Sequence, residues 1–280
     1  MRKLPLLVSG LLFAAAAGPL FPQFNKDEID ARSRWEDFLR TARITDEEQL
    51  GGPDAVTKPW KFLLEKDGTV RSGLWKDVEQ GDAGIRDFWK FEIAAYLLDG
   101  LLELNMIPPT VERRYQGRKG SLQIWLDDAP DLKKLTQQGL AAPPDHRERW
   151  NRTAFIERAF DSFIGNEDRN ANNILVTADW RMILIDHSRS FRSAGNFIER
   201  LMFGENGFLR AAGGGPYPIW PLPRAFVEKF KALDPAAVKK ILRPLLTPGE
   251  IDALFARRTL ILAELAAAAQ KWGKDKVLYE

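Results

Sequence analysis

Strand-like and helix-like segments are separated along this chain, and that separation is the strongest constraint on its fold. Up to about residue 127, short apolar runs alternate with Gly, Pro and Asp-Gly turns, with one amphipathic helix among them. Later segments follow mostly helical spacing. An order of strands, one helix, strands and then mostly helices differs from the regular alternation of a βαβ protein. We therefore expect an α+β fold with a β-rich lobe at 45–127 and an α-rich lobe at 128–280, preceded by a helical extension at 18–44.

Local patterns place the individual elements. The Asp67-Gly68 pair predicts a tight hairpin, and Asp234-Pro235 and the Thr247–Glu250 capping box predict helix starts. The expected strands lie near 47–50, 59–65 and 69–76, with a hairpin turning at Lys119-Gly120 and a short one turning at 177–181. The expected helices lie in 24–42, 86–104, 145–163 and near 248–271.

Composition excludes several kinds of site. The 280 residues carry a formal net charge of +2, and the basic residues are scattered, so no nucleic-acid footprint is expected. Because the chain has no Cys, disulfides, Cys-ligated zinc and a thiol nucleophile are excluded. The two histidines, His146 and His187, are too few for a multi-His metal site.

The first 17 residues have the features of a secretory signal peptide. Arg2 and Lys3 precede an apolar run from Leu4 to Ala17, and Ala15 and Ala17 form an A-x-A cleavage site. An uncleaved membrane anchor is the alternative, and either form would place the remainder outside the cytosol. We expect an exported, periplasmic or secreted protein, or one associated with a membrane through this segment.

Acidic and amide residues gather around one short predicted hairpin, in the stretch "GNEDRNANNILVTADWRMILIDHSRSF". A hairpin would bring Asn173, before its first strand, next to Asp186, after its second, with Asp168 leaning over the same point. Oxygen ligands of this kind suit Mg²⁺, and a second carboxylate can accept a hydroxyl proton. Turn formation alone explains Asp179 and largely Asn170, but not an Asp placed directly after an apolar strand.

The D-x-x-x-x-N spacing followed by an apolar "ID" resembles the protein-kinase superfamily. The words "FDSFIGNEDR" and "DHSRSF" resemble its atypical branch: phosphatidylinositol kinases, HipA-type kinases and above all the secretory-pathway Golgi casein kinases. The resemblance implies a two-lobed kinase-like fold, Asp168 as catalytic base, and Asn173 and Asp186 as ligands of Mg²⁺. The sequence departs from ordinary kinases at Asn166 and His187, which replace a His and the Phe of D-F-G. It has no A-P-E, and it lacks the cysteines of the Golgi family.

The same resemblance assigns nucleotide-binding roles in the first half. Lys76 ends the third predicted strand and Glu92 lies on the following helix, where kinases place the phosphate-binding Lys and the Glu that orients it. The segment with Gly51, Gly52 and Thr57 would cover the phosphates. The segment joining the lobes would present backbone groups of Gln123 to Trp125 to the adenine.

The expected function is therefore transfer of the γ-phosphoryl group of ATP, with Mg²⁺, to a hydroxyl acceptor. Protein Ser or Thr, a lipid and a sugar remain open as acceptors. Two alternatives stay open as well: a pseudokinase-type nucleotide-binding or interaction module without turnover, and a Mg²⁺-dependent hydrolase in which Asp168 orients water.

Overall fold

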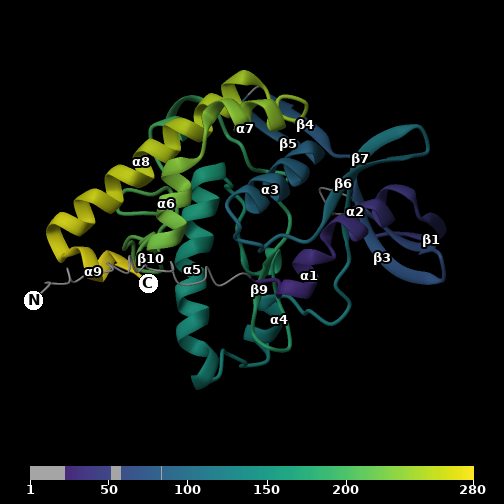
Figure 1. The fold of residues 1–280 in the computed structure, drawn as a ribbon, viewed down its shortest axis with the longest axis horizontal. Helices are drawn as coiled ribbons and strands as arrows, with labels where there is room; N and C mark the ends of the chain where they lie inside the picture. The colour runs from purple at the N-terminus through teal and green to yellow at the C-terminus, as the bar shows by residue number, and fades with distance from the viewer. Residues whose placement is uncertain (1–22, 52–57, 83) are drawn as a thin grey trace, which may run out of the picture.

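The structure, a computed structural model, describes residues 23–51, 58–82 and 84–280. It is mixed α+β, as the order of elements predicts, and its largest sheet is antiparallel with the strand order β1-β2-β3-β7-β6. Figure 1 shows this sheet at one end of the molecule and most of the helices at the other. The strands are β1 Arg43–Gln49, β2 Trp60–Lys66, β3 Thr69–Lys76, β6 Thr110–Tyr115 and β7 Arg118–Ile124.

Glycine has different roles in the two long hairpins, β2–β3 and β6–β7. The predicted β2–β3 turn at Asp67-Gly68 is confirmed, with positive φ at both residues. The predicted β6–β7 turn at Lys119-Gly120 is wrong, because the turn lies at Gln116-Gly117, with φ of 47° and 78°. Gly120 instead lies within β7, where a Cβ atom would come within 2.6 Å of the Trp75 ring. This glycine permits close packing in the sheet rather than a turn.

One face of the sheet packs against the N-terminal helices. The predicted helical segment at 24–42 forms two helices, α1 Lys26–Asp30 and α2 Arg32–Thr41, and α1 begins at a capping box between Asn25 and Glu28. Helix α2 contributes Phe38 and Leu39 to a hydrophobic cluster with the sheet. The other buried members are Ala42, Phe62, Leu64, Trp75, Val111, Tyr115, Leu122 and Ile124.

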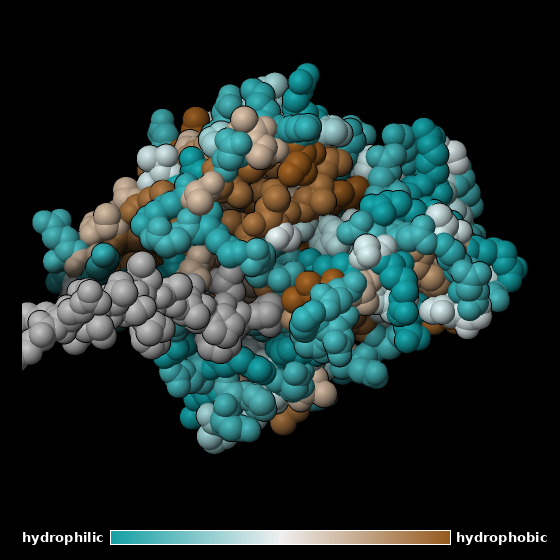
Figure 2. Space-filling view, viewed as in Figure 1, coloured by the Kyte–Doolittle hydropathy of each residue, from teal (hydrophilic) through white to brown (hydrophobic). Residues whose placement is uncertain are grey.

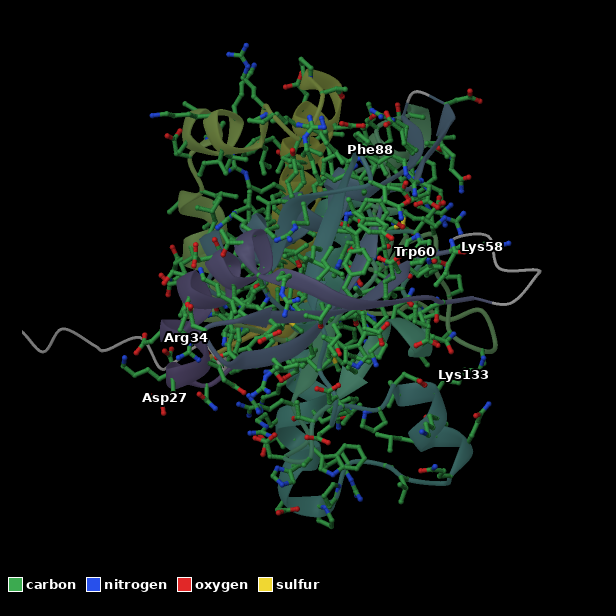
Figure 3. The ribbon with its side chains drawn as sticks, turned by 90° about the vertical axis from the view of Figure 1, so that its right-hand side faces the viewer. Asp27, Arg34, Lys58, Trp60, Phe88 and Lys133 are labelled. Atoms are coloured by element: carbon green, nitrogen blue, oxygen red, sulfur yellow. The ribbon has the colours of Figure 1, made fainter. Side chains whose placement is uncertain are left out.

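A further, short hairpin, which the sequence does not predict, follows β3. Its strands are β4 Glu79–Asp82 and β5 Ile85–Phe88. The run "EQGDAGIRDF" lacks the apolar alternation that marks a strand, so periodicity gives no signal for it. Phe88, at the end of β5, is labelled near the top of Figure 3, above Trp60 of β2.

The remaining elements form a larger helical part. Its main core includes the apolar side chains of α3, which follows β5, together with those of α5, α6 and α8. The helices are α3 Trp89–Leu101, α4 Leu132–Gln137, α5 Pro144–Ile164, α6 Arg224–Ala232, α7 Pro235–Leu242, α8 Pro248–Trp272 and α9 Lys274–Val277. Two-stranded pairings join β8 Ile174–Val176 to β9 Met182–Leu184, and β10 Leu222–Pro223 to β11 Leu278–Tyr279.

Both predicted helix starts in this part are confirmed. The Asp234 carboxylate accepts from Ala236 N and Ala237 N at the start of α7. At the start of α8, Thr247 and Glu250 form the reciprocal capping box. These signals succeed because the bonds join residues two or three positions apart, so they depend little on the rest of the fold.

The surface is uneven in polarity. Figure 2 shows hydrophilic residues over the sheet end and an apolar area around α3 and α7, where Leu101 and Ile241 are 38% and 37% exposed. No helix within 23–51, 58–82 or 84–280 is both long and apolar enough to cross a membrane. The predicted signal peptide or anchor at 1–17 lies outside the described residues.

Candidate functional site

The loop that carries Asp168 is shaped by the residues just before it. Helix α5 ends at Gly165, which has a left-handed φ of 63° and closes the helix. The fully buried Asn166 then links two parts of the loop, because its side chain donates to Asp161 Oδ1 (3.0 Å) and accepts from Asp168 N (3.1 Å). Asn173 Nδ2 donates to the Asp168 carbonyl at 2.9 Å. Asp168 and Asn173 are therefore held in one loop, as their five-residue spacing predicts.

Arg169 fixes this loop to the β8–β9 hairpin. Its guanidinium bonds both oxygens of Asp161, at 2.6 and 3.1 Å, and both groups are almost fully buried. It also donates to the carbonyls of Asn173 (2.6 Å) and Ile185 (2.9 Å), and to His187 Nε2 (2.9 Å). Because Arg has only donors, Nε2 must accept and the ring is neutral. Burial also lowers the pKa of His187.

Asp186 follows β9 in a left-handed conformation, with φ of 59°. Its Oδ1 accepts from Lys76 Nζ at 2.7 Å, and the same Nζ donates to Glu92 Oε1 at 2.7 Å. The second oxygen of Glu92 accepts from His187 N at 2.9 Å. Residues from β3, α3 and the segment after β9, up to 110 positions apart, thus meet at one ammonium group.

The electrostatics keep this group ionised. Burial by itself would lower the pKa of Lys76, but the charges of Asp186 and Glu92 outweigh burial and raise it. Burial would likewise raise the pKa of Glu92, and Lys76 lowers it below its usual range. The pKa of Asp168 is raised, first by burial and then by Asp186, against the opposing charge of Arg189.

A cavity of about 560 Å³ connects the two acids. Asp168 and Asp186 both line it, and each side chain is 38% exposed. Ile174 pairs with Leu184 in the β8–β9 hairpin, and Ile185 N donates to Asn173 O at 3.2 Å, which places Asn173 beside the strand end that carries Asp186. The predicted hairpin therefore brings its two polar ends together.

Asn173 and Asp186 offer suitable atoms for a divalent cation. The nitrogen of the Asn173 amide donates to Asp168 O, which leaves the amide oxygen as the atom that could bind a cation. Asn173 itself is buried and is not among the residues that line the cavity. The described parts of the chain contain no group of three or more His, Cys, Asp or Glu side chains that could hold a metal ion. Two oxygen ligands fit Mg²⁺, which takes its remaining ligands from water and phosphates.

The other predicted nucleotide-binding residues are distributed differently. Gln123 lies in β7 and its side chain donates to Thr110 Oγ1 at 2.9 Å. Trp125 donates its backbone N–H to Ser72 O at 3.0 Å, so this group is not available to an adenine. Its side chain lines a different cavity, of about 600 Å³. Gly51 is exposed at the end of β1, with φ of 100°, whereas Gly52 and Thr57 lie outside the described residues.

Three residues at the site went unrecognised in the sequence. Asp161 and Arg169 supply the buried ion pair under the loop, and Asp87 of β5 lines the cavity. For Arg169 the available signal is its place directly after the predicted base, within a run of turn-forming residues. Asp161 and Asp87 carry no local signal, because Asp161 lies within the helical run "FDSF" and Asp87 lies in a run without strand periodicity.

A scan of protein-family models and a search of curated proteins gave no match to this chain. What the protein does is therefore inferred from its own residues.

Proposed function

We propose that the protein is an ATP- and Mg²⁺-dependent phosphotransferase with a two-lobed, protein-kinase-like arrangement, which transfers the γ-phosphoryl group to a hydroxyl acceptor. The observation that carries the proposal is the double contact of Lys76 Nζ, 2.7 Å from both Glu92 and Asp186, beside the cavity that Asp168 lines. An ion pair between a Lys of the third strand and a Glu of the next helix is the phosphate-positioning device of kinases.

The two-lobed arrangement is supported by the hydrophobic clusters. The sheet and α2 share one cluster, and the helical part has another. Helix α3 lies in the sequence between β3 and β6 of the sheet but packs its apolar side chains into the second cluster, while its Glu92 reaches Lys76 of β3. A nucleotide between the two parts would therefore contact both through one ion pair.

Each residue has a defined part in the reaction. Lys76 would hold the nucleotide phosphates, and Glu92 would keep Lys76 in place. Asp168 would orient the acceptor hydroxyl and take its proton as the acceptor oxygen bonds to the γ-phosphorus. The bond from that phosphorus to the β–γ bridging oxygen breaks, which gives ADP and a phosphoester. Asn173 and Asp186 would hold Mg²⁺, which neutralises phosphate charge when bound.

The first test is thermal unfolding of the purified chain with ATP, with and without Mg²⁺. At ATP concentrations of about 100 Kd, binding adds about 2.7 kcal/mol. A chain of 280 residues should then melt about 5 °C higher. Asp186→Ala should lose the Mg²⁺-dependent part of this rise, and Asp179→Asn, an exposed change in the β8–β9 turn, should retain it. An undiminished Mg²⁺-dependent rise in Asp186→Ala would refute the metal assignment.

Asp168→Asn separates binding from transfer. It should keep the ATP-dependent rise in melting temperature but lower phosphoryl transfer by about 100-fold or more, because a positioned base contributes that much. Assays of ADP and free phosphate without an added acceptor distinguish transfer from hydrolysis. Release of phosphate at the full rate without an acceptor would favour a hydrolase, and nucleotide binding without turnover would favour a pseudokinase-type module.

A further inference from the structure

The β4–β5 hairpin forms the wall of the cavity opposite the two catalytic-site acids. Gln80 and Asp87 from this hairpin line the same 560 Å³ as Asp168, Asp186 and Arg189. In the sequence, the hairpin lies between β3, which ends in Lys76, and α3, which carries Glu92. It shares its cavity with Asp168, the proposed base.

The hairpin is fixed to the segment that follows Asp186. Phe88 N donates to Ser188 O at 2.9 Å, and Ser193 N donates to Gly84 O at 3.0 Å. The buried Arg192 also donates to the Arg86 carbonyl. These backbone contacts come from both ends of β5, so the wall is held in a defined position and the cavity has a defined shape.

Asp87 is the feature of this wall that points to a ligand. The residue is only 9% exposed, and one carboxylate oxygen accepts from Gln80 Nε2 at 3.3 Å. The other oxygen, Oδ1, is buried and has no hydrogen-bond partner among the described residues. A buried carboxylate oxygen without a donor is unfavourable. Because Asp87 lines the cavity, a rotation of its carboxylate would bring this oxygen to a hydrogen-bond donor bound there, which would stabilise it.

The charges around the cavity indicate which kind of acceptor substrate could supply this hydrogen-bond donor. Three carboxylates line the cavity, those of Asp87, Asp168 and Asp186, against two guanidiniums. Lys76 Nζ lies 2.7 Å from Asp186, and Arg189 lies 3.7 Å from Asp168. Both guanidiniums already pair with Glu167, Arg189 at 3.1 Å and Arg192 more closely. The surplus of negative charge disfavours an anionic acceptor, whereas hydroxyl groups can donate to the carboxylates. A volume of 560 Å³ is also that of a small-molecule site.

We infer that the acceptor is an uncharged polyhydroxy compound, a sugar or polyol, bound between the β4–β5 hairpin and the segment after Asp186. One of its hydroxyls donates to Asp87, and a neighbouring hydroxyl lies at Asp168 and receives the phosphoryl group. This inference rests on the proposed function. It makes Asp87 and Gln80 residues that determine acceptor specificity.

The test uses the full chain with radiolabelled ATP, Mg²⁺ and a panel of acceptors. The uncharged members are glycerol, inositol and the methyl glycosides of xylose, glucose, galactose and mannose. The anionic and peptide members are glucuronate and Ser- and Thr-containing peptides. We expect phosphorylation of at least one uncharged polyhydroxy compound, with glucuronate and the peptides poor acceptors. A preference for a peptide or an anionic acceptor would overturn the inference and leave the proposed function standing. Mg²⁺-ATP binding without phosphorylation of any panel member would overturn the proposed transfer reaction, and the inference with it, in favour of the pseudokinase-type module.

Variants of Asp87 test the named contact. Asp87→Asn, which keeps the shape of the side chain, and Asp87→Ala should raise the KM of that acceptor by about 10- to 100-fold, since a hydrogen bond to a charged group is lost. They should leave kcat and the stabilisation by Mg²⁺-ATP nearly unchanged. Asp82→Asn, an exposed change in the same hairpin, is the control. An unchanged KM in folded Asp87 variants would refute the acceptor inference and leave the proposed function standing. Failure of the wild-type chain to bind Mg²⁺-ATP would refute the proposed function itself.

Discussion

Replacing Arg169 tests whether the buried network under the loop that carries Asp168 stabilises the fold as well as the site. The Arg169 side chain is 3% exposed and makes five hydrogen bonds to four residues. Two of the bonds are charge-assisted and go to Asp161, which is fully buried. Arg169→Met would keep most of the side-chain volume and remove every one of these bonds.

The expected cost follows from what the change leaves behind. The Arg169 charge and its hydrogen bonds hold the pKa of Asp161 below its usual range despite burial. Without Arg169 the Asp161 carboxylate would be buried and uncompensated, and breaking a buried pair in this way costs about 3–5 kcal/mol. Arg169→Lys keeps the charge but not the bidentate geometry, so it should cost less than Arg169→Met and more than 1 kcal/mol, about the net value of one hydrogen bond.

Urea unfolding at neutral pH gives the measurement. The midpoint should fall with an unchanged denaturant slope, which reports lost stability rather than a changed unfolded state. Arg40→Met is the matched control, because Arg40 pairs with Glu36 on an exposed helix face, where such pairs contribute about 0.5 kcal/mol or less. A loss below about 1 kcal/mol in Arg169→Met, or a loss no larger than in Arg40→Met, would refute the assigned role of the network.

Asp99→Asn and Gly120→Ala test the fold away from the loop that carries Asp168. Burial raises the pKa of Asp99 to about 6. The folded chain therefore keeps a proton that the unfolded chain releases near pH 4. As a result, the contribution of Asp99 to the free energy of unfolding falls by about 3 kcal/mol as the pH rises from about 4 to 6. Asp99→Asn should remove that part of the pH dependence in urea titrations at pH 4.5 and 7, and an unchanged dependence would contradict the assignment. Gly120→Ala would press a Cβ atom against the Trp75 ring and the Lys76 carbonyl, and should cost about 1–3 kcal/mol. Gly100→Ala, with open space around its Cβ position, should be neutral or stabilising; urea unfolding of both glycine variants gives the comparison.

Sequence signals predicted the fold where the deciding interactions are local. The Asp67-Gly68 turn and the caps at Asp234 and Thr247 depend on a few adjacent residues, and all three are confirmed. The Lys119-Gly120 turn was wrong because the reason for Gly120 is the Trp75 ring on the neighbouring strand, 45 residues earlier in the chain. A glycine that permits close packing and a glycine that permits a turn look the same in a single sequence.

The residues of the candidate site likewise fall into those brought together by local structure and those brought together only by the tertiary fold. Asp168, Asn173 and Asp186 lie within 19 residues, and a short hairpin was enough to bring them together. Lys76 and Glu92 meet Asp186 only through the tertiary fold, and the resemblance to kinases, not their spacing, predicted that meeting. Asp87 escaped notice because its hairpin has no periodic pattern. Ser72 uses the N–H of Trp125. The adenine-binding role expected for the Gln123 to Trp125 backbone stays a prediction, as do the metal, base and phosphate-binding roles.

The position of Asp186 connects the stability of the fold to its proposed chemistry. A left-handed backbone at a residue other than Gly costs about 1 kcal/mol or more, so Asp186 needs contacts on both sides to hold its φ of 59°. Arg169 bonds the carbonyl of the residue before it, and Glu92 bonds the N–H of the residue after it. The first contact belongs to the loop of Asp168 and the second to the ion pair of Lys76. The proposed base, the proposed metal ligand and the proposed phosphate-binding Lys are therefore coupled through one short segment of backbone. A change in either support should move all three, which is why Arg169→Met should weaken Mg²⁺-ATP binding as well as the fold.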